Sequence, residues 1–171
     1  YEFVESDIPA MADFGSGYRY HVTGLCHDET GFPTNDPEKI DKFMHRINRK
    51  ISRYADEIVS FDVIGDEDAD VLIMAYGSSA RSVRQALRMK NDDDPRVKLF
   101  QPYTIWPFPE DAFKDAASGC KAIVCVEANA GQMKREIERL VNDDVPISLV
   151  SSINGEPIVP MDVLKAAKEV I

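Results

Sequence analysis

Short apolar runs alternate with amphipathic segments from residue 58 to the end of the chain. Runs rich in Val, Ile and Phe predict strands at 58–64, 71–76, 97–103, 121–126 and 147–150. Apolar residues recurring three and four apart predict helices at 82–90, 110–117, 133–141 and 161–171. Strands and helices alternating at this spacing form right-handed βαβ units, so we predict an α/β fold, a three-layer α/β/α sandwich.

The run 71–76 is the most informative of these strands. It carries no charge and lies between Asp70 and Gly77, which is typical of a strand buried on both faces at the centre of a parallel sheet. Gly77 leaves room for a tight turn, and Ser78 or Ser79 can cap the following helix through a hydroxyl.

Residues 1–57 show a different pattern. Residues 1–35 mix Gly and Pro with aromatics, which indicates an extended arm lying on a protein surface. Asp36 and Pro37 then open a helix that we expect to run to residue 57. We therefore divide the chain into a connecting arm and helix, 1–57, and an α/β domain, 58–171.

One face of the 36–57 helix is apolar, and basic residues crowd the other. They are Arg46, Arg49, Lys50 and Arg53. We predict that this basic face is solvated, and it is also the one local patch that could meet an acidic partner or a phosphate.

Composition excludes several classes of protein. The 171 residues include 30 acidic and 20 basic ones, and a net charge of −10 argues against nucleic acid as a partner.

The three cysteines, Cys26, Cys120 and Cys125, form no C-x-x-C pair, so we expect a reducing, cytoplasmic compartment. No apolar run approaches the ~18 residues of a membrane span, and no leader opens the chain. A start at Tyr1 suggests a piece of a longer protein.

Two clusters have a metal-ligand composition without the matching spacing. Residues 21–29 collect two His, one Cys and two carboxylates, for which we expect polar contacts within a loop. Asp66, Asp68 and Asp70 begin like a calcium loop, but Val71 stands where that loop needs Gly. We predict no metal site.

The strand ends offer one candidate ligand site. In open α/β sheets, ligands bind outside the carboxyl ends of strands where the strand order reverses. The residues expected to flank that crevice are Gly77, Ser78, Ser79, Glu127, Asn129, Gly131 and Gln132. Two helix N-termini, a carboxylate and two amides suit a small polar or anionic ligand, although Glu127 opposes an anion and an unliganded crevice fits equally well.

The segment Trp106-Pro107-Phe108-Pro109 has two interpretations. Its prolines fix an extended backbone, so Trp106 and Phe108 form a rigid aromatic ridge. The ridge is either a packed βα loop or a docking surface for another domain.

Motifs for self-sufficient catalysis are missing. The chain has no G-x-G-x-x-G after a strand, no phosphate loop, no G-x-S-x-G elbow, and no Gly-Asp-Gly with a downstream Asn for thiamin diphosphate and magnesium. We assign no catalytic, cofactor-binding or metal-binding residue.

Five segments, taken together and in order, resemble the C-terminal part of the alpha subunit of 2-oxoacid:ferredoxin oxidoreductases, particularly the 2-oxoglutarate enzyme. They are the T-G-L-C-H-D-E-T-G-F-P-T run at 23–34 with Asp36-Pro37, the basic helix, Tyr76-Gly77-Ser78, W-P-F-P at 106–109 and E-A-N-A-G-Q at 127–132. One departure is Ala130, where the family often has a second Gly.

The resemblance implies a transketolase C-terminal-like domain with a mixed five-stranded sheet ordered 1-3-2-4-5, whose first strand, 59–64, is antiparallel. It implies a parent complex that oxidatively decarboxylates a 2-oxoacid with coenzyme A to an acyl-CoA and reduces ferredoxin. Thiamin diphosphate, magnesium and iron–sulfur clusters would bind to other domains and subunits.

This piece would then be a structural and assembly domain. Trp106 and Phe108 would face a neighbouring domain, and residues 1–35 would join the preceding thiamin-pyrimidine domain. Two alternatives stay open. One is a small-anion or regulatory ligand-binding domain, whose binding Ser78→Asp would abolish, and the other is a stand-alone enzyme. The sequence does not decide which 2-oxoacid the parent uses.

Overall fold

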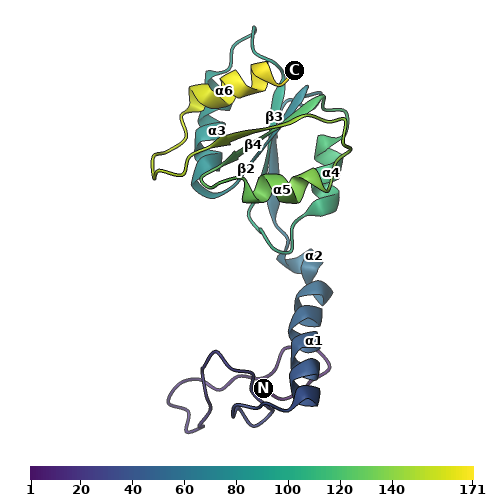
Figure 1. Ribbon diagram of the computed structural model, residues 1–171, viewed down its shortest axis with the longest axis vertical. Coiled ribbons are helices and arrows are strands. Elements are labelled where there is room, and N and C mark those ends of the chain that lie inside the picture. The colour runs from purple at the N-terminus through teal and green to yellow at the C-terminus, as the bar shows by residue number, and fades with distance from the viewer. The chain divides into compact units, whose positions relative to one another are not determined.

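The computed structural model describes residues 1–171 as two compact units, Tyr1–Ile58 and Val59–Ile171. We describe each unit by itself. The first contains the arm and two helices, and the second contains the sheet and its four covering helices (Figure 1).

The helices of the first unit are α1, Pro37–Arg53, and α2, Ala55–Ile58. The side chain of Asp36 accepts the backbone N–H of Glu38 at 3.0 Å, and Pro37 occupies the first turn, which confirms the predicted start. The predicted single helix to residue 57 is interrupted, because Tyr54 leaves helical geometry.

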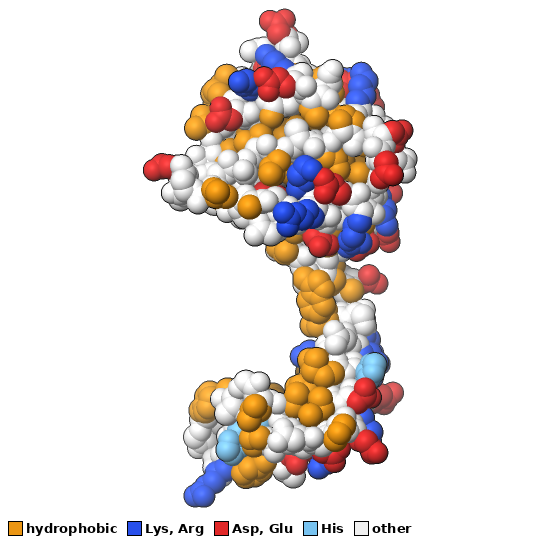
Figure 2. Space-filling model, in the orientation of Figure 1, with side chains coloured by type: hydrophobic (Ala, Val, Ile, Leu, Met, Phe, Trp, Pro, Cys, Tyr) orange, Lys and Arg blue, Asp and Glu red, His pale blue; other side chains and the backbone are white.

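The predicted solvated basic face of α1 holds only in part. The side chains of Arg49 and Arg53 are 57% and 48% exposed, but the arginines of this face also hold the arm. Arg46 is only 3% exposed and donates to the carbonyls of Tyr1 and Glu2 at 3.1 and 3.2 Å. Arg49 forms a bidentate pair with the buried carboxylate of Asp7. The arm therefore supplies the acceptors that a separate acidic partner would otherwise provide. Figure 2 shows hydrophobic side chains along α1. Met44 of this helix is 44% exposed.

The T-G-L-C-H-D-E-T-G-F-P run closes a turn on itself. The N–H of Asp28 donates to the carbonyl of Phe32 at 2.9 Å, and the Asp28 carboxylate accepts the N–H of Thr30 at 2.9 Å. His27 is buried and stacks on Tyr1 with ring centroids 5.1 Å apart. These contacts are the polar loop contacts that the sequence predicts for this segment.

The second unit contains one five-stranded sheet, in the order β1-β3-β2-β4-β5. The strands are β1 (Phe61–Gly65), β2 (Val71–Ala75), β3 (Val97–Pro102), β4 (Ala122–Glu127) and β5 (Ile147–Ser151). β1 pairs with β3 antiparallel and the other pairs are parallel. The predicted mixed sheet and strand order are confirmed.

Helices cover both faces of this sheet (Figure 1). They are α3 (Gly77–Met89), α4 (Glu110–Ala117), α5 (Gln132–Glu138) and α6 (Pro160–Glu169). α3 and α6 pack on one face with the side chains of Val71, Ile73 and Ala75, whereas α4 and α5 pack on the other with Leu72 and Met74. All five residues of β2 are fully buried, as expected for the central strand.

The hydroxyls of Ser78 and Ser79 do not cap α3, contrary to the prediction. The helix begins at Gly77, directly after the strand, and its N-cap is Tyr76 with no side-chain cap hydrogen bond. Both serines therefore lie inside the first turn of α3, after its N-cap, where a serine hydroxyl does not cap the helix start.

An arginine on α3 fixes the antiparallel edge strand. Arg84 donates to Asp62 of β1 at 2.9 Å and to Gln101 of β3 at 2.8 Å, and the Tyr103 hydroxyl donates to the same Asp62 carboxylate at 2.7 Å. One guanidinium thus joins a helix to both strands of the edge pair.

Candidate functional site

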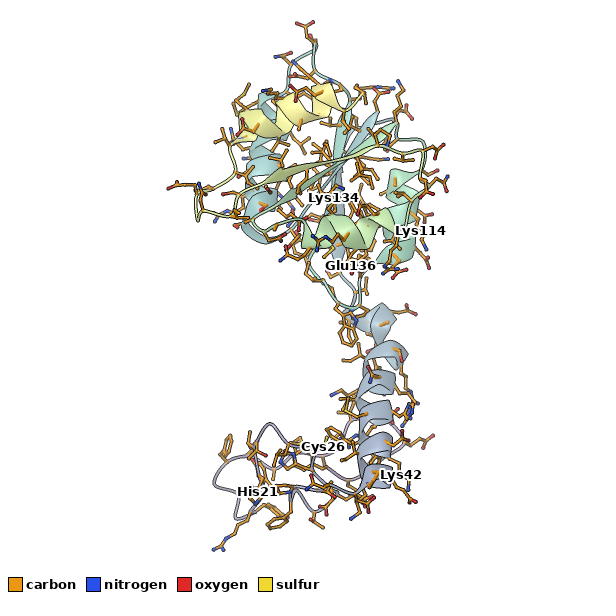
Figure 3. The ribbon with its side chains drawn as sticks, in the orientation of Figure 1. His21, Cys26, Lys42, Lys114, Lys134 and Glu136 are labelled. Atoms are coloured by element: carbon orange, nitrogen blue, oxygen red, sulfur yellow. The ribbon has the colours of Figure 1, made fainter.

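Glu127, the last residue of β4, is completely buried at the carboxyl end of the sheet. Its two carboxylate oxygens accept the backbone N–H groups of Met133 and Lys134, each at 3.0 Å. These N–H groups lie in the first turn of α5, where Figure 3 labels Lys134. The buried charge is therefore stabilised by the positive end of a helix, and this carboxylate is already occupied.

Asn129 forms the turn between β4 and α5. Its amide oxygen accepts the N–H groups of Gly131 at 2.9 Å and Gln132 at 3.0 Å. Gly131 has φ +87°, and an added Cβ would lie 3.2 Å from the Leu149 side chain. The positive φ and the close Leu149 side chain both favour glycine at position 131.

Tyr76 connects the ends of β2 and β4, and sequence reasoning missed this role. Its hydroxyl accepts from the Asn129 amide nitrogen at 2.6 Å and donates to the Glu127 carboxylate at 3.4 Å. Burial, with the Glu127 charge as the second cause, raises the pKa of Tyr76. The sequence signal for this role was the position of Tyr76 directly after β2, because β2 and β4 are neighbours in the sheet.

A hollow of about 230 Å³ lies beside this network, and we call it the serine hollow. It is lined by Ser78, Ser79, Ser82, Ala128, Ser152, Ile153, Gly155, Glu156, Pro157 and Ile158. Of the residues predicted to flank the crevice, Ser78 and Ser79 line the hollow. Gly77, Glu127, Asn129, Gly131 and Gln132 do not.

Sequence reasoning missed Ser82 and the wall formed by residues 152–158. The signal for the wall was the Asn154-Gly155 turn, which follows β5, the neighbour of β4.

The two aromatic residues of the predicted ridge lie in different environments. Phe108 is half-buried and packs with Phe100 and Phe113, at centroid distances of 6.2 and 5.8 Å. Trp106 is 66% exposed. The loop is therefore anchored to the core through Phe108 and leaves the indole on the surface.

The polar cluster of the arm forms no metal centre. Figure 3 places His21 and Cys26 on this arm, and no group of three or more His, Cys, Asp or Glu side chains could hold a metal ion. None of the helices is long and apolar enough to cross a membrane.

Comparison with known proteins adds the following. The family model described as pyruvate:ferredoxin oxidoreductase core domain II matches residues 69–163. The 2-oxoglutarate synthase subunit KorA of Methanothermobacter marburgensis is 37% identical over 155 residues, which cover 90% of this chain and 41% of that subunit. The chain thus spans about two-fifths of the length of this relative.

Two solved structures are similar as well. A 2-oxoglutarate:ferredoxin oxidoreductase from Magnetococcus marinus, with 2-oxoglutarate, coenzyme A and succinyl-CoA bound, superposes with a TM-score of 0.78 and 27% identity, over 99% of this chain and 30% of that one. A split-gene transketolase, an inactive β4 tetramer, gives a TM-score of 0.55 at 17% identity, over 65% of this chain and 41% of that one. The second likeness concerns the fold alone.

Proposed function

Because this chain belongs to the family of pyruvate:ferredoxin oxidoreductase core domain II, we propose that it is an assembly domain in the alpha subunit of a 2-oxoglutarate:ferredoxin oxidoreductase. The whole complex would oxidatively decarboxylate 2-oxoglutarate with coenzyme A, forming succinyl-CoA and reducing ferredoxin. The names of the relatives from Methanothermobacter and Magnetococcus support this choice of 2-oxoacid.

The observation that carries the assembly role is the internal use of the motif residues. Glu127 and Asn129 are engaged by backbone N–H groups of their own turn and helix, and Asp28 is engaged by Thr30. Groups held in this way position the backbone and are not free to act on a substrate. The motif residues would therefore act as folding devices.

The residues present do not fit thiamin diphosphate, magnesium or an iron–sulfur cluster. The Glu127 carboxylate at the strand ends is occupied, and the three cysteines belong to no group of side chains that could hold a metal ion. Cys125 is fully buried in the core. We derive no step through these groups and propose that they bind to other domains and subunits of the complex.

Trp106 is the proposed contact with a neighbouring domain, contributed by another subunit of the complex. An exposed indole on a loop held by Phe108 offers a large apolar area at little entropic cost. Residues 1–35 would form the connection to the preceding thiamin-pyrimidine domain of the same subunit.

The first experiment is purification of the native full-length subunit from its own cells, with intact mass, co-purifying subunits and visible absorption recorded. We expect a longer chain, brown partners, and ferredoxin reduction that requires both 2-oxoglutarate and coenzyme A. Pyruvate and 2-oxoisovalerate serve as control substrates. A colourless chain that ends where this one does and copurifies with nothing would contradict the proposal.

The docking role is tested in the same full-length complex with Trp106→Ala. We expect the variant to keep native circular dichroism, but its complex should dissociate at a higher protein concentration than the unmodified complex does. Met161→Ala is the matched control, because Met161 is a large apolar residue, 54% exposed, on α6. Equal dissociation of both variants would remove Trp106 from the interface.

A further inference from the structure

The serine hollow contains hydroxyls that the protein itself does not use. Ser78, Ser79 and Ser82 of α3 all line it, and none of their hydroxyls has a hydrogen-bond partner. Ser79 is the decisive one, because it is only 6% exposed and lines the hollow. The only fully buried unpaired side-chain atoms are Arg46 Nε and Ser148 Oγ, so the Ser79 hydroxyl is open to the hollow and free to bond a water or a ligand there.

The backbone at the same place adds further donors. The first N–H of α3 that finds a backbone acceptor is that of Ala80, at 3.4 Å from the Tyr76 carbonyl. The N–H groups of Gly77, Ser78 and Ser79 come before it, and no side chain caps them. A 13-residue helix thus presents free N–H groups and the positive end of its dipole beside three hydroxyls.

The opposite wall is held in place before any ligand arrives. The Ser152 hydroxyl lies 2.9 Å from the Asn154 amide oxygen and 2.5 Å from the Glu156 carbonyl, and the N–H of Glu156 donates to Asn154 at 3.0 Å. Ile158 is buried in the core below this loop. The hollow is therefore preformed, which lowers the cost of ordering it on binding.

Charge and size restrict what the hollow can hold. Glu127, the carboxylate expected to oppose an anion, is fully buried against α5 and does not line the hollow. Glu156 does line it, and no Lys or Arg does. At about 230 Å³ the space is smaller than a drug-sized pocket. The occupant should be a small group that accepts many hydrogen bonds and is bound without a cation.

We propose that the serine hollow binds a phosphate group, either as the free ion or at the end of a phosphate ester. A tetrahedral oxyanion presents four oxygens to the three hydroxyls and the free N–H groups, whereas a carboxylate presents only two. Without a paired cation, and with Glu156 nearby, binding is weak, in the millimolar range. This site does not depend on the function proposed above, because the isolated chain binds phosphate whether or not it belongs to an oxidoreductase complex.

The test is a titration of the ¹⁵N-labelled 171-residue chain with inorganic phosphate, with chloride at equal ionic strength as the blank. We expect saturable shifts of the Ser78 and Ser79 amide signals that chloride does not reproduce. A parallel titration with phenyl phosphate separates the two sources. Shifts with both probes indicate an ester terminus, and shifts with inorganic phosphate alone indicate the free ion. Shifts with neither probe would overturn the proposal.

Four variants locate the site. Ser78→Asp places a carboxylate among the donors and should abolish binding, and it is tolerated because Ser78 is exposed and an acidic residue suits a helix start. Ser79→Ala should weaken binding about fivefold, the value of one hydrogen bond. Glu156→Gln should tighten it about threefold, more so at low salt. Ser118→Ala, at the end of α4, is the control. Unchanged affinity in both Ser78→Asp and Glu156→Gln would place the phosphate elsewhere and refute the assignment.

Discussion

Replacing Glu127 by Gln isolates the contribution of one buried carboxylate to the fold. The carboxylate serves two N–H groups of α5, and Gln keeps only one oxygen to accept them. One bond falls from charge-assisted to neutral, which costs about 1 kcal/mol, and one buried N–H loses its acceptor, which costs roughly 1–3 kcal/mol. Removing the buried charge offsets part of this cost, but the N–H groups stay buried. We expect a net loss of about 2 kcal/mol.

The assay is urea unfolding followed by far-ultraviolet circular dichroism, with thermal melting in parallel. A loss of this size should lower the melting temperature by roughly 6 °C. Amide hydrogen exchange should also accelerate at Met133 and Lys134 before other core amides. Glu138→Gln is the control, because Glu138 is exposed and only pairs with Lys134. A loss below about 1 kcal/mol, or one equal to the control, would refute the capping role of Glu127.

Three further predictions concern the arm and the exposed indole. The hydrogen bond from Arg49 holds the pKa of Asp7 below the ordinary pKa of an aspartate. The Arg49–Asp7 pair therefore stabilises the arm fully at any pH above that ordinary pKa, and the stabilisation is lost as the pH falls through the lowered pKa of Asp7. Amide exchange of the arm should therefore rise in strongly acidic solution, and Asp7→Asn should raise it already at neutral pH. Gly31→Ala should loosen the arm, as seen by limited proteolysis, because its Cβ would meet another side chain at 2.9 Å. Gly17→Ala, with a similar φ and open space, should change it less, and equal effects would exclude the steric reason. Trp106 is the single tryptophan, so its fluorescence should be strongly quenched by acrylamide, and weak quenching would contradict its exposure.

The sheet was predictable because burial leaves a local record in the sequence. A strand covered on both faces, such as Val71–Ala75, needs an apolar residue at every position, and that pattern is readable without any tertiary information. The strand order came from the resemblance, since periodicity alone does not say which strands are neighbours. Helix ends were less accurate. Gly77 follows β2 directly into α3, and only the backbone geometry reveals that no serine cap is used.

The contacts of the arm could not be predicted from local patterns. Arg46 and Arg49 occupy a polar helix face, which normally means solvent, but their partners are carbonyls and a carboxylate about 45 residues earlier in the chain. Hydrogen bonds to backbone carbonyls leave no compositional signal at the acceptor. The candidate crevice was predicted only in part. Glu127 and Asn129 were recognised as polar residues at a strand end, but the sequence did not show that backbone N–H groups of the Gly131 turn and of α5 occupy them.

The antiparallel pairing of β1 has a consequence for synthesis of the chain. β1 leaves the ribosome before any other strand of the sheet, yet its only neighbour, β3, is made after β2 and α3 are complete. Until then Phe61 and Val63 belong to an unpaired strand that could join a nascent strand of another molecule. Asp62 stands between them, and a charge inside a strand opposes such pairing. Its later partner Arg84, on α3, also emerges before β3. Asp62, which binds Arg84 in the folded sheet, therefore also protects the β1 strand from wrong pairing before β3 is made.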